Sequence, residues 1–450
     1  MALKNRVQKN IDMTKGDIYR LLIAFALPLF LGDLFQQLYN LTDTWVIGNY
    51  ATNDEYAAVG TCFHIFNLLI KTFIGFSSGA GIVIARYFGA DDKEKVRRGA
   101  STAIWIALGC SVFFTIFGWF IVPHALVWSK VPDSIRDYST TYLRILISFI
   151  TAQIIYNMGA GILRAVGDSR KPFFYLVAAA FINVVLDMYF VIVLGWGIKG
   201  VAWATAIAQC CAALLIIIEL LTTKLDVRIG KGSFAFDGSI CRSMVMLGIP
   251  TAIQMGITSI SNVLIQSFVN GLGINFLSGY STYSKCEQLL FMSATSMSIA
   301  CMTFVSQNHG AGDLERARKG IKASLVILSS YVAVICLILV VFTPQIAAFF
   351  NSEPEVIKYS VMALRMVTPF FFVQCGCQTL MGAMRGIGNT KTPMFLQIGF
   401  NVLFRQIAIR LITKYIAYTP FTVLIVQPLS WIVLLCALLF AARKTVLFKK

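Results

Sequence analysis

The sequence has few charged residues and almost no histidine. Charged residues fill 13% of the 450 positions, and only 3 residues are His. Soluble domains carry about a quarter charged residues, so this composition excludes a soluble globular protein. The chain also lacks a Walker A motif, a dinucleotide-binding glycine fingerprint and an HExxH motif. The sequence therefore gives no motif for binding ATP, a dinucleotide or a catalytic zinc ion.

Cysteine is present without the spacing that metal sites or disulfide frameworks need. The 11 Cys are scattered, and the two close pairs, Cys210-Cys211 and Cys375-x-Cys377, lie in apolar stretches. We interpret them as small packing residues.

Long apolar runs dominate the chain instead. Apolar residues make up 57% of the sequence, and the mean hydropathy is +0.74. A helix needs about 20 apolar residues to cross a bilayer. Twelve such runs are predicted, at approximately 17–47, 56–84, 98–122, 138–163, 171–194, 199–222, 242–271, 277–305, 320–343, 357–384, 392–415 and 420–441. The expected fold is an all-α membrane protein, because runs without alternation do not suit a barrel.

The net charge of +17 is distributed unevenly between the two sides of the membrane. Segments on the side of both termini, with the span ends that border them, hold 27 Lys and Arg, whereas the opposite loops with their bordering span ends hold 5. This asymmetry predicts cytoplasmic N- and C-termini. The basic excess is thus explained by topology, and we expect no nucleic-acid partner. We also expect no cleavable signal peptide.

The sequence contains an internal repeat. Gly89–Gly99 recurs as Gly310–Gly320, an offset of 221 that also relates Arg164 to Arg385. We predict two six-helix lobes related by pseudo-two-fold symmetry, at 1–222 and 242–450 with a basic tail, joined by a cytoplasmic linker at 223–241. Repeats of this size in apolar chains are typical of transporters. The basic loops that follow spans 2 and 8 are expected to form short cytoplasmic helices.

Two predicted spans of the first lobe carry polar residues at helical spacing. Residues at i, i+4 and i+7 share one face of a helix, and carboxylates at membrane depth are costly enough to need a reason. Paired carboxylates with amide and hydroxyl oxygens suit a small alkali cation or a shared proton. The alternative is a set of interhelical hydrogen bonds that lock packing. The residues are Gln36, Asn40 and Asp43 in span 1, Asn183 and Asp187 in span 5, and Thr205 in span 6.

The second lobe differs. Asn401 is followed four residues later by Arg405, where the first lobe has an aspartate. Span 7 carries Gln254, Thr258, Asn262 and Gln266 at intervals of four, which predicts a wet cavity or a buried polar seam. Lys285 and Glu287 lie in span 8, and Arg405 is a candidate partner for Glu287. Pro28 and Pro250 occupy matching places in spans 1 and 7 and predict kinks. His64 is interpreted as a packing residue.

Four stretches of the sequence carry a family resemblance: Gln37-Leu38-Tyr39-Asn40-Leu41-Thr42-Asp43-Thr44, the turn Gln307-Asn308-His309-Gly310-Ala311-Gly312, and the two loops that begin at Arg164 and Arg385. Together they resemble the multidrug and toxic compound extrusion (MATE) family, and its DinF-like prokaryotic branch in particular. The resemblance implies a cation site in the first lobe. Its residues match Asp43, Asn183, Asp187 and Thr205 as Na⁺ ligands, with Tyr142 and Asn157 from span 4 beside them.

The resemblance implies a secondary multidrug efflux transporter and not an enzyme. It would move organic, often cationic compounds outward against Na⁺ or H⁺ by rocker-type alternating access. The expected substrate cavity contains Gln36, Asn40, Gln254, Asn262, Gln266, Lys285, Glu287 and Arg405. The alternative is a lipid-linked oligosaccharide flippase of the same superfamily, which would need a strongly cationic cavity. We expect a monomer in the bacterial or archaeal cell membrane, with membrane lipid and a small amphipathic substrate as partners and no cofactor beyond the coupling ion.

Overall fold

The structure is a computed structural model that describes residues 12–129, 131–230 and 234–448, apart from the side chain of His64. The first half contains α1 (Ile18–Tyr50), α2 (Asn53–Gly89), α3 (Lys93–Trp128), α4 (Asp133–Ser148), α5 (Ile150–Ala165), α6 (Arg170–Asp187), the π-helix η1 (Met188–Val193) and α7 (Gly197–Thr222). The second half contains α8 (Gly238–Asn270), α9 (Ile274–Gly310), α10 (Leu314–Val341), α11 (Thr343–Phe350), α12 (Pro354–Val367), the 3₁₀ turn η2 (Thr368–Phe370), α13 (Phe371–Gly386), α14 (Lys391–Leu396), the π-helix η3 (Gln397–Phe404), α15 (Arg405–Tyr415) and α16 (Pro420–Arg443).

The predicted all-α membrane fold is confirmed. Within the described ranges, 11 helices are long and apolar enough to cross a membrane, and α4 with α5 makes up to 12. Predicted span 4 is not straight, because α4 and α5 meet at a bend of 48°. The bend lies at Phe149, and the residue 221 positions later, Phe370, ends the turn η2. The fourth span is therefore interrupted at the same place in both copies.

The sequence repeat is also a repeat of hydrogen bonds. Asp92 and Asp313 are related by the same offset, and each accepts a backbone N–H three residues later, which caps the start of α3 or α10. The hydroxyl of Ser77 donates to the carbonyl of Asn157 at 2.9 Å, and Ser298 repeats this contact with Gln378 at 2.8 Å. The two copies thus share both a helix cap and a hydrogen bond between helices distant in the sequence.

The basic segments after α2 and α9 do not form separate helices, so that expectation is wrong. Lys93 and Leu314 instead begin the long helices α3 and α10. The physical reason is the aspartate cap. Asp92 and Asp313 satisfy the first free N–H groups of each helix, which starts immediately after the tight turn.

The chain packs as two compact units. Among the described residues, one unit holds Asp12 and the described parts of 27–252, and the other holds residues 13–26 and 253–448. Helices α1 and α8 therefore each contribute to both units, and Pro28 and Pro250 lie within two residues of the two crossings. The predicted boundaries at 222 and 242 stay a prediction.

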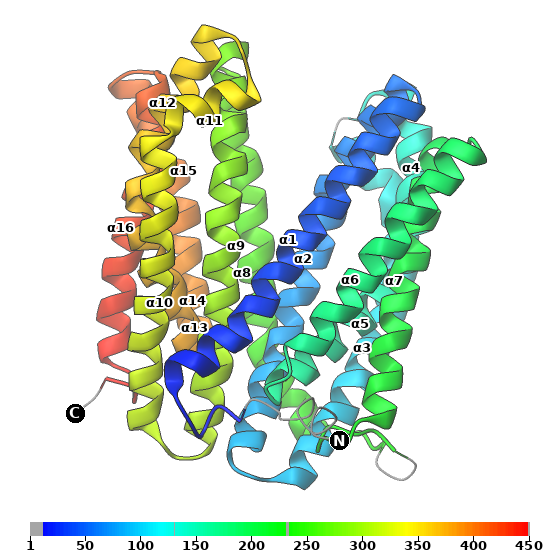
Figure 1. Ribbon diagram of the computed structural model, residues 1–450, viewed down its shortest axis with the longest axis vertical. Coiled ribbons are helices and arrows are strands. Elements are labelled where there is room, and N and C mark those ends of the chain that lie inside the picture. Colours follow the sequence, from blue (N-terminus) through cyan, green and yellow to red (C-terminus); the bar gives the residue numbers. More distant parts are fainter. Residues whose placement is uncertain (1–11, 130, 231–233, 449–450) are drawn as a thin grey trace, which may run out of the picture. The chain divides into compact units, whose positions relative to one another are not determined.

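The first unit is held together by one large buried cluster. It joins residues of α2, α3, α5 and α7 with Ile240 and Met244 from the start of α8. Helices α6 and α7 also lie side by side in this unit (Figure 1). Because α8 begins after α7 has ended, its first turns complete a core that otherwise belongs to the first half of the sequence.

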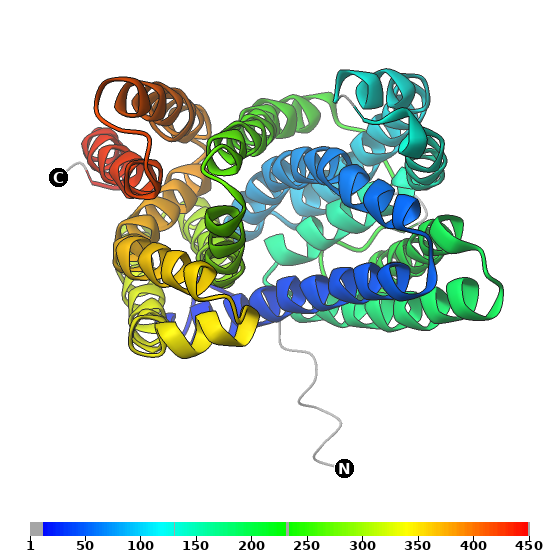
Figure 2. The ribbon, with the colours of Figure 1, turned by 90° about the horizontal axis from the view of Figure 1, so that it is seen from above.

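The second unit packs α9 against α12 and α13, while α15 and α16 lie side by side at one edge (Figure 2). The chain before α1 belongs to this unit. Met13 is fully buried there, its N–H donates to the Gln307 side chain, and its carbonyl accepts from Asn308 and Arg316. The start of α1 is thereby fixed to the turn between α9 and α10.

Candidate ion site and its surroundings

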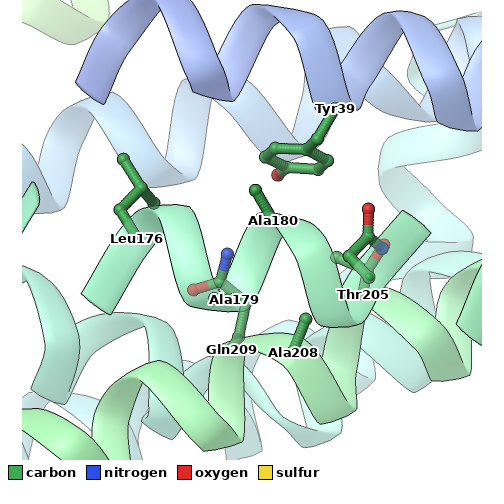
Figure 3. A pocket seen from close by; sticks show the side chains of 8 residues that line it. Tyr39, Leu176, Ala179, Ala180, Thr205, Ala208 and Gln209 are labelled. Carbon is green, nitrogen blue, oxygen red and sulfur yellow. The ribbon is translucent and has the colours of Figure 1, made fainter. Parts of the chain in front are cut away.

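A small pocket in the first unit lies between α1, α6 and α7. Its volume is ≈ 10 Å³, which is about the size that admits one water molecule. Figure 3 shows Tyr39 extending from α1 over Ala180 of α6, with Thr205 and Gln209 contributed by α7. The lining residues are Tyr39, Leu176, Ala179, Ala180, Asn183, Thr205, Ala208 and Gln209. A small, mostly apolar pocket with a few polar groups suits a single small guest.

The two predicted acidic residues lie close together beside this pocket. Asp187 is fully buried and Asp43 is 8% exposed, and their carboxyl groups lie near enough to interact. Both Asp187 oxygens, Asp43 Oδ1 and Asn183 Oδ1 are buried without a hydrogen-bond partner. Buried acceptors are normally satisfied, so this group of oxygens has the chemistry to hold a hard cation or protons.

Local helix geometry explains how the residues meet. Asn183 and Asp187 are four apart on α6, and the Asn183 amide donates to the Thr205 hydroxyl on α7 at 3.4 Å. Directly after Asp187 the helix continues as the π-helix η1. Wider turns of this kind are frequent at functional sites. The amide is held by Thr205, so its oxygen is left free on the side away from that bond.

The two residues from span 4 have different surroundings. Tyr142 is 8% exposed and lies near enough to interact with both Asp43 and Asp187. Asn157 lies on α5, beyond the bend, and its amide donates to the Gln153 carbonyl of its own helix at 2.8 Å. The structure therefore places Tyr142 with the acidic pair, while the Asn157 amide is turned to its own backbone.

Two residues at the site were missed from the sequence. Tyr39 lies in the pocket lining, with Gln36 and Gln209 beside its hydroxyl. Tyr39 precedes Asp43 by four residues, and Gln209 follows Thr205 by four. The same i, i+4 rule that grouped the other residues could have found both. Asn40 is half-buried and is not part of the pocket lining.

The predicted polar face of α8 is largely occupied by two arginines. The Gln254 side-chain oxygen accepts from Arg385 at 2.9 Å, and the Asn262 oxygen accepts from Arg405 at 3.1 Å. Gln266 donates to Asn270 within α8. Gln254 is buried, whereas Asn262 is exposed, so the two contacts differ in their access to solvent.

Gln427 of α16 lies between Glu287 and Arg405. Its oxygen accepts from Arg405 at 3.4 Å and its amide donates to Glu287. The predicted partnership is thus bridged, and among the described ion pairs none joins Glu287 to Arg405 directly. The Lys285 ammonium lies apart from them, 5.0 Å from the Phe350 ring centre.

A larger pocket of ≈ 880 Å³ lies elsewhere in the first unit, at the starts of α2 and α4 and the turn before α7. Its walls include the carboxylates of Glu55 and Asp137 and the rings of Trp196 and Trp203. No group of three or more His, Cys, Asp or Glu that could hold a metal ion occurs in the described part of the chain.

Comparison with known proteins agrees with this architecture. Solved structures of a multidrug resistance MATE family transporter of the MOP superfamily, in an outward-facing conformation, and of MATE in a bent conformation are similar in fold. Each has a TM-score of 0.90 at 22% identity. The first comparison covers 98% of both chains, and the second covers 97% of both.

Among curated relatives, the probable multidrug resistance protein YoeA of Bacillus subtilis is 27% identical over 86% of this chain and 85% of its own length. The probable multidrug resistance protein NorM of Thermotoga maritima is 24% identical over 84% of this chain and 82% of its own. The MatE family model matches residues 28–189 and 250–416, one stretch in each copy of the repeat. The chain therefore belongs to the MatE family.

Proposed function

We propose that this protein is a secondary multidrug efflux transporter that exchanges amphipathic organic compounds, many of them cationic, for inward-moving Na⁺ or H⁺. The observation that best supports this proposal is the group of buried oxygens on Asp43, Asn183 and Asp187 that have no hydrogen-bond partner. A buried acidic pair is costly unless a cation or protons occupy it. The names of the curated relatives support multidrug compounds as the substrate class.

The ion site offers a physical means of coupling. Asp43 lies on α1 and Asp187 on α6, so an ion bound by both restrains one helix against the other. A ligand shifts a conformational equilibrium only by its different affinity for the two states. We therefore assign coupling to an ion that binds the acidic pair more tightly in one state, within rocker-type alternating access.

The remaining parts of the proposal follow from the same role. The coupling ion is the only cofactor, the partners are the small substrate and membrane lipid, and the unit of function is a monomer that carries out no catalysis. The protein resides in the bacterial or archaeal cell membrane, with both termini in the cytoplasm. The oligosaccharide flippase is the weaker alternative, because the first unit presents buried carboxylates rather than a cationic surface.

Transport into everted vesicles tests this function. We expect a fluorescent organic cation to accumulate when an outward-directed Na⁺ or H⁺ gradient is imposed, and the effective gradient identifies the ion. Asp187→Asn should abolish gradient-driven accumulation, because it removes one charge of the pair. Asp137→Asn is the matched control, since Asp137 is an exposed residue at the rim of the larger pocket. Full gradient-driven activity in Asp187→Asn would contradict the proposal.

A further inference from the structure

The half-buried Arg164 and the buried Arg385 occupy equivalent places in the two copies of the repeat, but their partners differ in charge. Arg164 and Arg385 are related by the offset of 221, and their partners Asp33 and Gln254 lie on α1 and α8, the first helix of each copy. In the first unit the Asp33 carboxylate lies near enough to Arg164 to interact with it. In the second unit the Arg385 guanidinium donates to the neutral side chain of Gln254 at 2.9 Å. The carboxylate of the first copy is thus an amide in the second.

The Arg385 charge is poorly compensated. Its side chain is 9% exposed, and its Nε has no hydrogen-bond partner. Among the described residues, no salt bridge is formed by Arg385. A buried cation without a counter-ion is strongly destabilising. Gln254 is itself 4% exposed and also contacts the Met381 sulfur, so water compensates this pair little.

The helix ends do not explain the difference. Arg164 is the residue before last of α5, and Arg385 is the residue before last of α13. The negative end of each helix therefore stabilises both guanidinium groups to a similar degree. What distinguishes the second copy is the missing carboxylate, which leaves the buried Arg385 Nε without a hydrogen-bond partner.

We propose that Arg385, held by Gln254, is an anion-accepting site that binds the carboxylate or phosphate group of a ligand. This inference deepens the proposed efflux function, since it extends the substrate class to amphipathic compounds with an acidic group. The guanidinium has a planar set of donors that fits such oxyanions in a two-bond geometry. Gln254 keeps the guanidinium oriented until the oxyanion replaces the amide oxygen. Because Arg385 lies at the predicted cytoplasmic end of its helix, the anion can come from a substrate or from an inner-leaflet lipid.

A pair of dyes that differ by one charge provides the test. Rhodamine 110 carries a free carboxylate, and rhodamine 123 is its methyl ester. Binding of each to the purified full-length protein in nanodiscs would be measured by fluorescence polarisation. Gln254→Glu places a carboxylate beside Arg385, as Asp33 does beside Arg164. We expect it to weaken binding of the acid about tenfold or more, as the loss of a charge-assisted hydrogen bond predicts, and to leave ester binding unchanged.

Control variants separate this effect from a general change in charge or folding. Gln345→Glu makes the same substitution at an exposed site on α11 and should change neither affinity. Gln254→Glu supplies a counter-ion, so we expect this variant to fold, which its thermal unfolding would verify.

Nanodiscs with and without phosphatidylglycerol distinguish a substrate from a lipid as the source of the anion. If lipid phosphate occupies the site, this lipid weakens acid binding to the wild type but not to Gln254→Glu.

Three results would overturn the inference. Equal loss of both dyes in Gln254→Glu would show a merely structural contact. An unchanged ratio of acid to ester affinity would show that no carboxylate binds there. Binding of the ester alone by the wild type would refute the anion site and leave the efflux proposal standing, whereas failure to bind either dye would count against both.

Discussion

At the scale of single residues, Gly197 shows how one position fixes a connection between helices. Its φ is +51°, and a Cβ there would lie 2.2 Å from the Glu55 carboxylate. That carboxylate accepts the Ile198 N–H at 2.9 Å and, with Thr52, caps the start of α2. Glycine at 197 therefore lets one carboxylate tie the turn before α2 to the turn before α7.

We predict that Gly197→Ala destabilises the protein by about 2–4 kcal/mol, because it combines a left-handed backbone with a steric clash. Thermal unfolding in detergent would measure the loss. Gly195→Ala is the matched control, since Gly195 also has a positive φ of +65° but no atom within 4 Å of the added Cβ. It should cost about 1 kcal/mol, the backbone contribution alone. Equal losses in both variants would show that the Glu55 contact is unimportant.

At the scale of elements, α2 and the first half of α8 pack with their backbones in close approach. A Cβ at Gly75 would lie 2.7 Å from the Ala252 backbone, and one at Gly79 would lie 2.4 Å from the Gly248 backbone. Each helix thus offers two small residues spaced four apart. Such pairs let membrane helices approach closely, which is a main source of their association.

We expect Gly79→Val to force these helices apart and to lower the unfolding free energy by about 1–3 kcal/mol. The decrease would be measured by thermal or denaturant unfolding of the purified protein. Gly60→Val on the same helix is the control, because no atom lies within 4 Å of a Cβ at Gly60. The explanation fails if the Gly60 variant is destabilised as much as the Gly79 variant.

At the scale of the whole molecule, the uneven distribution of Lys and Arg predicts the orientation in the membrane. Cysteine introduced at Lys199 should react with an impermeant maleimide on intact cells, because the start of α7 is predicted to lie outside. Cysteine at Lys319, an exposed position at the start of α10, should react only after permeabilisation. The unmodified protein gives the background from its own 11 Cys. The reverse pattern would invert the predicted topology.

Much of this architecture could be predicted because it follows from local periodicity. The apolar runs gave the membrane helices, and spacings of four grouped Asn183 with Asp187. The bend at Phe149 could not be predicted, because no proline or glycine marks it in the first copy, although Pro369 lies at the matching break of the second. The arginine partners of Gln254 and Asn262 could not be predicted either, because helix periodicity shows which residues share a face but not which residues of another helix contact that face.

The shared use of α1 and α8 has a consequence for the order in which the protein assembles during synthesis. The core of the first unit needs Ile240 and Met244, which the ribosome makes only after α7 is complete. The second unit needs Met13, which is made before almost everything else. The early segment must therefore wait for a partner that lies 294 residues later in the chain. Neither unit can complete its core while the nascent chain is short. A fragment ending at residue 222 would lack the α8 side chains that fill the core of the first unit.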